Sequence, residues 1–189
     1  MLEKLIQLDR EVFVTINSQW HNGILDAVLP FARNPYTWAP LYFFLLVFMC
    51  YNFRWKGLVW VLFFIATFGI TDSISGQILK GMFERYRPCN DPFFSQFVRS
   101  LVPCAGRHSF PSNHAANHFA LAMFMFLSLK RPIGKWVWVA FLWAFLVSYA
   151  QIYTGQHYPS DVLYGTLAGL VFGTLTATIY NQRFKRFAL

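Results

Sequence analysis

Long apolar segments separated by short polar ones run through most of the chain. A transmembrane helix needs about 20 largely apolar residues to cross a hydrocarbon core of roughly 30 Å. Five segments meet or nearly meet that length, namely 34–53, 57–79, 112–129, 136–156 and 162–182. The pattern therefore predicts an all-α integral membrane protein, built as a bundle of five transmembrane helices in a single domain.

The first 33 residues show a different pattern. Apolar residues recur at helical spacing through 2–33, and Asn22-Gly23 interrupts them. Charged residues such as Glu3 and Lys4 break the apolar region that a signal peptide requires. We expect two amphipathic helices lying in the membrane interface, ahead of a transmembrane bundle over 34–182.

Charge placement predicts the orientation. The chain is 56% hydrophobic and only 13% charged, and its net charge is +8. With five spans, two short loops and the tail 183–189 share one face, which the positive-inside rule makes cytoplasmic. That face holds half of the 16 basic residues, namely Arg54, Lys56, Lys130, Arg131, Lys135, Arg183, Lys185 and Arg186. Membrane lipids therefore account for much of the charge, and neither nucleic acid nor a protein partner is implied.

The loops 80–111 and 153–160 would then face outward, into the periplasm if the protein lies in a bacterial inner membrane. The first of them carries five cations on the face that the positive-inside rule disfavours, Lys80, Arg85, Arg87, Arg99 and Arg107. Binding an anion is the simplest explanation. If the second span continues outward, Lys80 and Arg87 share one helical face and can together hold a phosphoryl group.

Two further stretches carry chemistry beside these cations. Pro111-Ser112-Asn113-His114 begins a predicted helix, and free N–H groups make a helix start an anion site. Ser112 can cap that helix or donate to a phosphate, and His114 could protonate a leaving oxygen. In the other stretch, Asp161 follows His157 by four residues. Its carboxylate could accept a proton from one ring nitrogen and leave the other as a nucleophile.

Three remaining residues carry weaker predictions. Cys89 and Cys104 both lie in the outward loop, and in an oxidising periplasm they could form a disulfide, although spacing alone leaves two free thiols open. Asp72, inside the second predicted span, is more simply paired across the bundle than catalytic. No metal and no cofactor are expected.

Together these stretches resemble the type-2 phosphatidic acid phosphatases, whose pattern is K-x6-R-P, then P-S-G-H, then S-R-x5-H-x3-D. Lys80, Arg87 and Pro88 match the first motif, Pro111, Ser112 and His114 match the second, and His157 and Asp161 match the third. The resemblance implies that His157 attacks phosphorus, that Asp161 orients it and that His114 protonates the leaving group. It also implies that Lys80, Arg87, Ser112 and the Asn113 backbone hold the phosphoryl oxygens.

The chain departs from that pattern at Asn113, which replaces glycine, and at Ala150-Gln151, which replaces serine and arginine. Gln151 brings no charge, so one phosphate cation is missing, and Arg107 in the loop is the candidate to supply it. The resemblance implies hydrolysis of a lipid phosphate or diphosphate at the outer face, with undecaprenyl diphosphate as the favoured substrate. A lipid-phosphate phosphotransferase and a non-catalytic lipid-phosphate binding or translocating protein are the alternatives.

Overall fold

The computed structural model describes residues 1–184, so most of the tail 183–189 predicted to be cytoplasmic lies outside the described residues. Within that range the fold is helical, and its one β-type contact is an isolated bridge between Tyr86 and His108. The helices are α1 (Leu2–Val14), α2 (Gly23–Arg33), α3 (Ala39–Ser73), α4 (Lys80–Met82), α5 (Asn113–Ile133), α6 (Trp138–Tyr153) and α7 (Pro159–Arg183).

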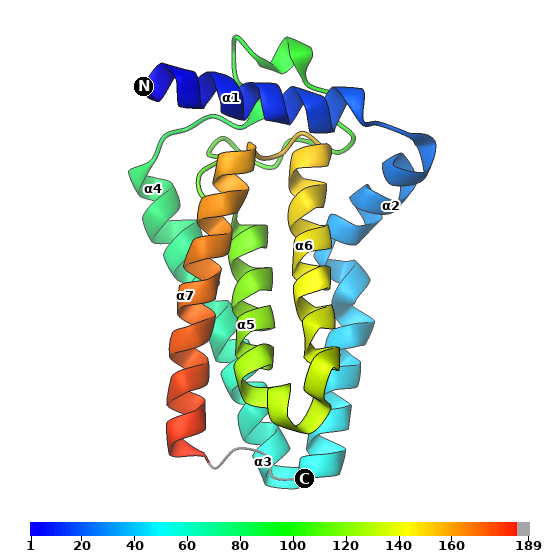
Figure 1. Ribbon diagram of the computed structural model, residues 1–189, viewed down its shortest axis with the longest axis vertical. Coiled ribbons are helices and arrows are strands. Elements are labelled where there is room, and N and C mark those ends of the chain that lie inside the picture. The colour runs from blue at the N-terminus through cyan, green and yellow to red at the C-terminus, as the bar shows by residue number, and fades with distance from the viewer. Residues whose placement is uncertain (185–189) are drawn as a thin grey trace.

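Three stretches of helix in the described part of the chain are long and apolar enough to cross a membrane: Pro35–Met82, Asn113–Tyr153 and Pro159–Arg183. The first two each double back. Arg54, at φ 50° and ψ −127°, breaks the helical path inside α3, and the close approach of Gly57 to the Met49 carbonyl packs the two arms together. Gly134, at φ 57°, ends α5 ahead of α6. Figure 1 shows both reversals at the end opposite α1.

Small residues bring α5 and α7 into close contact. A Cβ atom placed on Gly165, Gly169 or Gly173 would lie 2.5, 2.2 or 2.3 Å from backbone carbonyl oxygens of α5. Their four-residue spacing puts all three glycines on one face of α7, and such a stripe lets helix backbones approach closely in membranes. This contact sets the start of α5, with its Ser-Asn-His motif, against the start of α7.

A second group of contacts fills the lower half of the bundle. Trp60, Phe124 and Tyr180 are almost completely buried in one cluster shared by α3, α5 and α7. The indole Nε1 of Trp60 donates to the Ser128 hydroxyl at 2.8 Å, so its polar atom is satisfied inside the core. A second buried cluster, which includes Phe13 of α1, Phe94 of the long loop and Tyr153 of α6, packs the outer elements onto the other end of the bundle.

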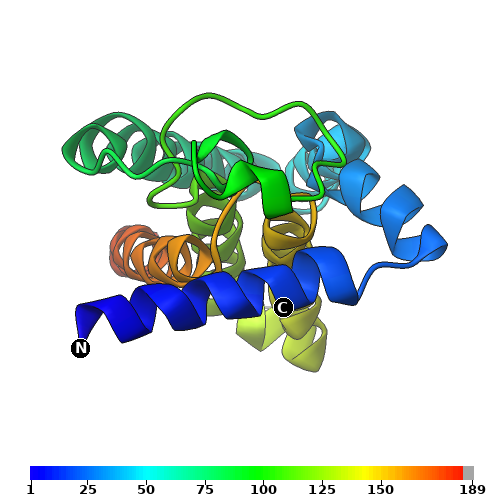
Figure 2. The same cartoon turned by 90° about the horizontal axis from the view of Figure 1, so that it is seen from above.

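The N-terminal helices form, as the periodicity predicts, and they cover one end and one side of the bundle. Asn22 caps α2 by accepting from the Leu25 N–H at 2.9 Å. Helix α1 runs across the end of the bundle, while α2 descends beside α6 (Figures 1 and 2). Arg99 of the long loop pairs with Asp26 and ties that loop to α2.

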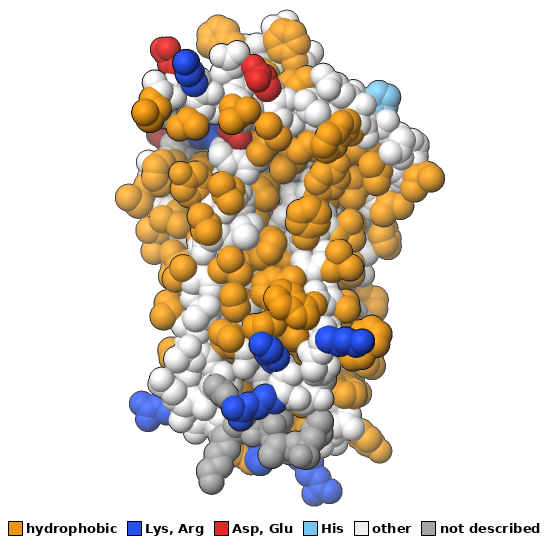
Figure 3. Space-filling model, in the orientation of Figure 1, with side chains coloured by type: hydrophobic (Ala, Val, Ile, Leu, Met, Phe, Trp, Pro, Cys, Tyr) orange, Lys and Arg blue, Asp and Glu red, His pale blue; other side chains and the backbone are white. Residues whose placement is uncertain are grey.

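The types of side chain on the molecular surface change along the long axis of the bundle. In Figure 3 apolar side chains cover the middle, basic ones gather at the end of the helix reversals, and acidic ones appear near α1. This distribution is typical of a protein that crosses a membrane along the bundle axis.

Candidate active site

The path of the chain between Lys80 and Arg87 differs from the prediction. The helix that carries Lys80 ends at Met82, and Phe83 is already extended, so the two cations do not share a helical face. Arg87 instead lies in the loop, where its N–H donates to the Arg107 carbonyl at 3.2 Å. A loop path, rather than a continued helix, brings Arg87 back over the bundle.

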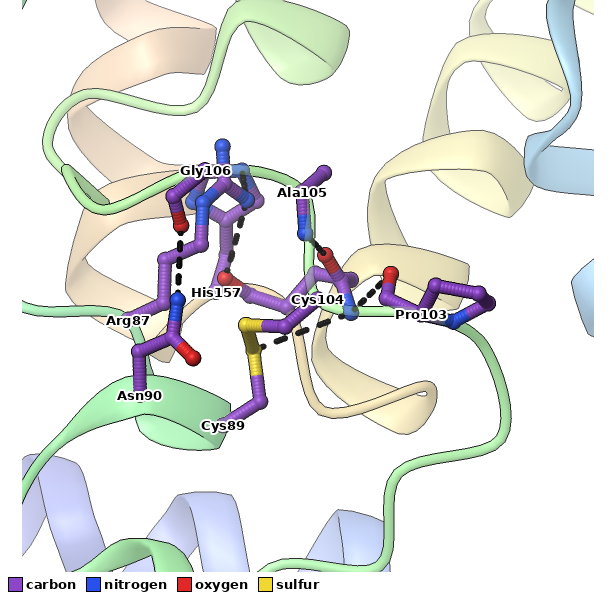
Figure 4. The surroundings of a disulfide bond; sticks show 9 residues. Arg87, Cys89, Asn90, Pro103, Cys104, Ala105, Gly106 and His157 are labelled. Carbon is purple, nitrogen blue, oxygen red and sulfur yellow. Dashed lines mark hydrogen bonds between the residues drawn. A yellow bond between two sulfur atoms is a disulfide. The ribbon is translucent and has the colours of Figure 1, made fainter.

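A disulfide between Cys89 and Cys104 closes this loop, with Cα atoms 6.0 Å apart. Beside it the Asn90 amide donates to the Gly106 carbonyl at 3.0 Å. Figure 4 shows Arg87 next to this cross-link with its guanidinium directed toward His157. The covalent bridge and the hydrogen bonds therefore fix the backbone from which Arg87 reaches the site.

Arg87 makes the closest contact with the predicted nucleophile. Its Nη1 lies 3.0 Å from Nε2 of His157 and also donates to the Gln156 carbonyl at 3.2 Å. An arginine only donates, so Nε2 of His157 accepts in this contact and carries a lone pair. The same nitrogen therefore faces a cation and is unprotonated, as a nucleophile toward a phosphoryl group must be.

His157 lies in the short connection between α6 and α7. Its N–H donates to the Gln151 carbonyl at 3.1 Å, at the end of α6, and Pro159 starts α7 two residues later. The imidazole is 1% exposed and therefore lies inside the protein, away from bulk water. Burial lowers the pKa of His157 to about 4, against the opposing influence of Asp161. The ring is therefore neutral near pH 7.

The predicted hydrogen bond between Asp161 and His157 does not form. The Oδ2 of Asp161 lies 3.7 Å from His157 Nδ1, an ion-pair distance that is too long for a hydrogen bond. Oδ2 instead accepts from the Ser109 hydroxyl and from the Tyr158 N–H, the latter at 2.8 Å. The carboxylate still faces Nδ1, so it favours the tautomer that leaves Nε2 free.

Arg85 is the principal residue that the sequence did not single out. Its Nη1 donates to Asp161 Oδ1 at 2.7 Å and its Nη2 to Asp9 Oδ2 at 2.6 Å. The hydroxyl of Ser160 joins the group by donating to Asp9 at 2.6 Å, and the guanidinium lies 4.1 Å from the ring centroid of Tyr158. In the sequence Arg85 is one of five cations of the outward loop, and nothing there pairs it with Asp9.

The Ser-Asn-His stretch begins α5 as expected. Ser112 is the N-cap, its side chain accepts from the Ala115 N–H at 3.4 Å, and its own N–H donates to the Asp161 carbonyl at 3.0 Å. The Asn113 side chain lies against Gly76 and donates to Asp72 at 3.4 Å, while Asn117 donates to the same Asp72 oxygen at 2.8 Å. Asp72 is thus paired across the bundle, as predicted, and Asn113 uses its side chain for this packing.

His114 occupies the first turn of α5. Its carbonyl accepts from His118 Nδ1 at 2.8 Å, and the two rings stack with centroids 6.4 Å apart. Within residues 1–184 the imidazole of His114 has no hydrogen-bond partner, while His157, Arg87 and Arg33 are within electrostatic reach. It is therefore available to exchange a proton with a bound group.

A pocket of about 360 Å³ lies between the end of the α4 helix and the outer loop that carries Arg87. The side chains that line it include Lys80, Arg87, Arg107 and His108. Arg107 is exposed there, donates to the Tyr86 hydroxyl at 2.6 Å and lies over that ring, so it stands at the outer rim. Gln151 is completely buried, and both polar atoms of its side chain lack a partner among the described residues.

Similarity to known proteins agrees with the sequence pattern. Residues 57–185 match the PAP2 superfamily. A lipid A 4'-phosphatase of Bacteroides thetaiotaomicron is 30% identical over 173 residues, 89% of this chain and 75% of the relative. An undecaprenyl-diphosphatase of Sulfolobus acidocaldarius is 29% identical over 181 residues, 94% of this chain and 81% of the relative.

Solved structures extend the likeness to three dimensions. The crystal structure of Aquifex aeolicus LpxE superposes with a TM-score of 0.68 at 29% identity, covering 89% of this chain and 93% of the other. A transmembrane PAP2-type phosphatidylglycerolphosphate phosphatase from Bacillus subtilis, at 24% identity and a TM-score of 0.72, shares the fold. Hydrolysis of a lipid phosphate fits the relatives, the membrane-length helices and the cationic pocket alike. The chain belongs to the PAP2 superfamily and is a membrane lipid phosphatase.

Proposed function

We propose that the protein hydrolyses its lipid phosphate in two steps through a phosphohistidine. In the first step Nε2 of His157 attacks phosphorus, the bond from phosphorus to the lipid oxygen breaks, and His114 gives that oxygen a proton. In the second step water attacks phosphorus and gives a proton to His114, the P–N bond breaks, and inorganic phosphate leaves. The 3.0 Å contact between Arg87 and Nε2 of His157 is the observation that carries this proposal.

The groups around Nε2 suit this chemistry. A phosphoryl group near Nε2 would lie beside Arg87, and Lys80 lines the same pocket. Charge on the phosphoryl oxygens must be stabilised in the transition state, and fixed cations in a site with little water do so without reorganisation. Asp161 stabilises the proton on Nδ1 as the ring becomes positively charged during attack. Ser112 and the Asn113 N–H, at the start of α5, complete the proposed phosphate cradle.

The proposed substrate is a lipid A phosphate, with undecaprenyl diphosphate as the second candidate. The resemblance to the family, taken alone, favours the diphosphate. Two relatives that match about nine-tenths of this chain are lipid A 4'-phosphatases, from Porphyromonas gingivalis and Bacteroides thetaiotaomicron, and this likeness changes the order. In both cases the reacting group is a phosphoryl ester at the head of an amphiphile that lies in the membrane.

We further propose that five helices cross a bacterial inner membrane, with the site at the periplasmic face. The two reversals, at Arg54 and Gly134, divide two of the membrane-length stretches into pairs of crossings. Basic residues flank both reversals and favour the cytoplasmic side for that end. The pocket and the disulfide lie at the opposite end, and a disulfide is more stable in an oxidising compartment. Helices α1 and α2 would then lie in the outer interface.

The test is phosphate release by the purified protein in detergent, from lipid A 1,4'-bisphosphate, undecaprenyl diphosphate and phosphatidylglycerophosphate. We expect activity in excess EDTA and inhibition by vanadate, which mimics the transition state when a histidine binds it. His157→Gln should abolish turnover and the acid-labile phosphoenzyme. Metal-restored activity after EDTA, or turnover by His157→Gln, would contradict the mechanism, and transfer of phosphate to a second lipid would identify a phosphotransferase.

A further inference from the structure

The matched motifs leave the phosphate site one cation short. Lys80 and Arg87 line the pocket, whereas Gln151 stands where the family pattern has arginine. The buried amide of Gln151 has no partner within residues 1–184, so it does not recruit another side chain. Arg107, which the sequence suggested as a substitute, is exposed and held by Tyr86.

Arg33, the last residue of α2, lies on the side of that helix which faces α6. Leu29, one turn earlier on the same helical face, is buried in a cluster with Ala150 and Tyr153 of α6. Trp38, five residues after Arg33, packs against Trp143 about two to three turns deeper along α6, with ring centroids 5.7 Å apart. Arg33 is therefore held between these two contacts along α6.

Along the bundle axis, His114 lies at a depth between these two contacts. Trp143 also contacts His118, at 4.6 Å between ring centroids, and His118 stacks under His114 one turn away. Electrostatics agrees with this placement, since Arg33 is within reach of His114. The pKa of Arg87 falls to about 10, chiefly through burial and next through the charge of Arg33. Arg33 and Arg87 are thus both within electrostatic reach of His114 and of each other.

Neither helix capping nor an ion pair explains the presence of Arg33 at the end of α2. A cation in the last turn of a helix often binds the free carbonyls there. In α2, however, the Phe31 carbonyl accepts from Thr37 at 2.8 Å and the Ala32 carbonyl from Trp38 at 2.7 Å. The Nε of Arg33 is buried without a partner, and no acidic side chain in the described part of the chain pairs with it. An unpaired Arg33 near the cation of Arg87 forms a favourable place for an anion to bind between them.

We propose that Arg33 is the third phosphate-binding cation of this enzyme, supplied by the N-terminal helix α2 in place of an arginine at position 151. The inference rests on the proposed function and names one more residue of the same site. The anion is the phosphoryl group of the lipid, which Arg33 would approach from the α6 side while Arg87 approaches from the loop. Helix α2 is then part of the phosphate site as well as an interfacial element.

Arg33→Met tests this assignment, because methionine keeps the apolar stem and removes the charge. We expect kcat/KM to fall by about 10²-fold, as for removal of one transition-state donor, and the inhibition constants of vanadate and inorganic phosphate to rise at least about tenfold. Gln151→Arg in the Arg33→Met background should recover part of both losses. Lys4→Gln removes an exposed charge from α1 and should leave both quantities unchanged.

Arg33→Lys keeps the charge and the stem, so it guards against misfolding of the methionine variant. Its inhibition constants should rise less than those of Arg33→Met. Wild-type inhibition by phosphate and vanadate in folded Arg33→Met, equal losses in Arg33→Lys and Arg33→Met, or a 10²-fold loss for Arg107→Met instead, would overturn the proposal. If the wild type released phosphate from no lipid, the proposed function would fail. Anion binding measured by thermal shift in the wild type, in Arg33→Lys and in Arg33→Met would still decide the role of Arg33.

Discussion

Arg85, rather than His157, is the close ionic partner of Asp161. Its Nη1 lies 2.7 Å from Asp161 Oδ1, whereas His157 Nδ1 is 3.7 Å from the other carboxylate oxygen. The other arm of the same guanidinium binds Asp9 of α1 at 2.6 Å. A helix lying across the end of the bundle is thereby connected, through one arginine, to the carboxylate that faces the proposed nucleophile.

Replacing Arg85 should harm both stability and catalysis. Arg85→Gln leaves Asp161 and Asp9 without their cation, and breaking a buried ion pair costs about 3–5 kcal/mol. We expect a large fall in Tm in detergent together with a fall in kcat. Asp9→Asn should reproduce the loss of stability and less of the loss of kcat, because it leaves the pair of Arg85 with Asp161 intact.

A matched control is the pair of Arg10 with Asp91, which also joins α1 to the outer loop. The side chain of Arg10 is 43% exposed, against 29% for Arg85, and its distance to Asp91 is 3.3 Å. Exposed pairs contribute about 0–1 kcal/mol, so Arg10→Ala should change Tm little. Equal effects of Arg10→Ala and Arg85→Gln on Tm would show that the ionic network around Asp161 contributes no more to stability than an exposed ion pair.

Acid should destabilise the protein in part through His157. Its pKa in the folded state is about 4, below the usual 6.5, so between these values the unfolded state binds more protons. The contribution of neutral His157 is complete above pH 6.5 and is lost as the pH falls toward 4. The Tm of the wild type should therefore decrease more steeply over this window than that of His157→Gln. Parallel curves for the two proteins would contradict a depressed pKa.

The disulfide should stabilise the loop and position Arg87, which lies two residues before Cys89. Closing a loop of this size is worth nominally about 3 kcal/mol in the loop-entropy treatment, and engineered bridges often deliver less. We expect Cys89→Ser with Cys104→Ser to lower the free energy of unfolding by about 1–3 kcal/mol. The same pair of changes should lower kcat/KM. Reductant should act on Cys50→Ala as on the wild type, because Cys50 is a free thiol.

The glycine contact between α5 and α7 should not tolerate a side chain. In Gly169→Ala the new Cβ would lie 2.2 Å from the Ala116 carbonyl oxygen, so the helices must separate. Overpacking of this kind costs about 1–3 kcal/mol. Activity should fall as well, because the contact sets Ser112 against Asp161. Gly69→Ala meets no atom within 4 Å and is the control, with an expected Tm no lower than that of the wild type.

Much of the candidate site was predictable because phosphoryl chemistry needs particular residue types next to each other in the chain. Ser112 and His114 mark a helix start, and His157 and Asp161 flank another, so local sequence already brings these pairs together. The G-x3-G-x3-G spacing at Gly165 is a sequence signal for the close contact of α7 with α5. Lys80 and Arg87 lie at one pocket, as their spacing suggests, but the helix expected to connect them ends at Met82.

The sequence by itself determined the membrane-length apolar segments, the two N-terminal helices and the residues that match the family motifs, because these depend on composition and short spacing. Only the tertiary structure decided which charges face one another. Arg33 and Arg85 reach the site from α2 and from the outer loop, and the partners Asp9 and Asp161 are 152 residues apart. Coulomb interactions depend on distance in space and on burial, and neither is encoded in local sequence pattern. The missing phosphate cation could therefore be noticed in the sequence, but its replacement could be found only in the fold.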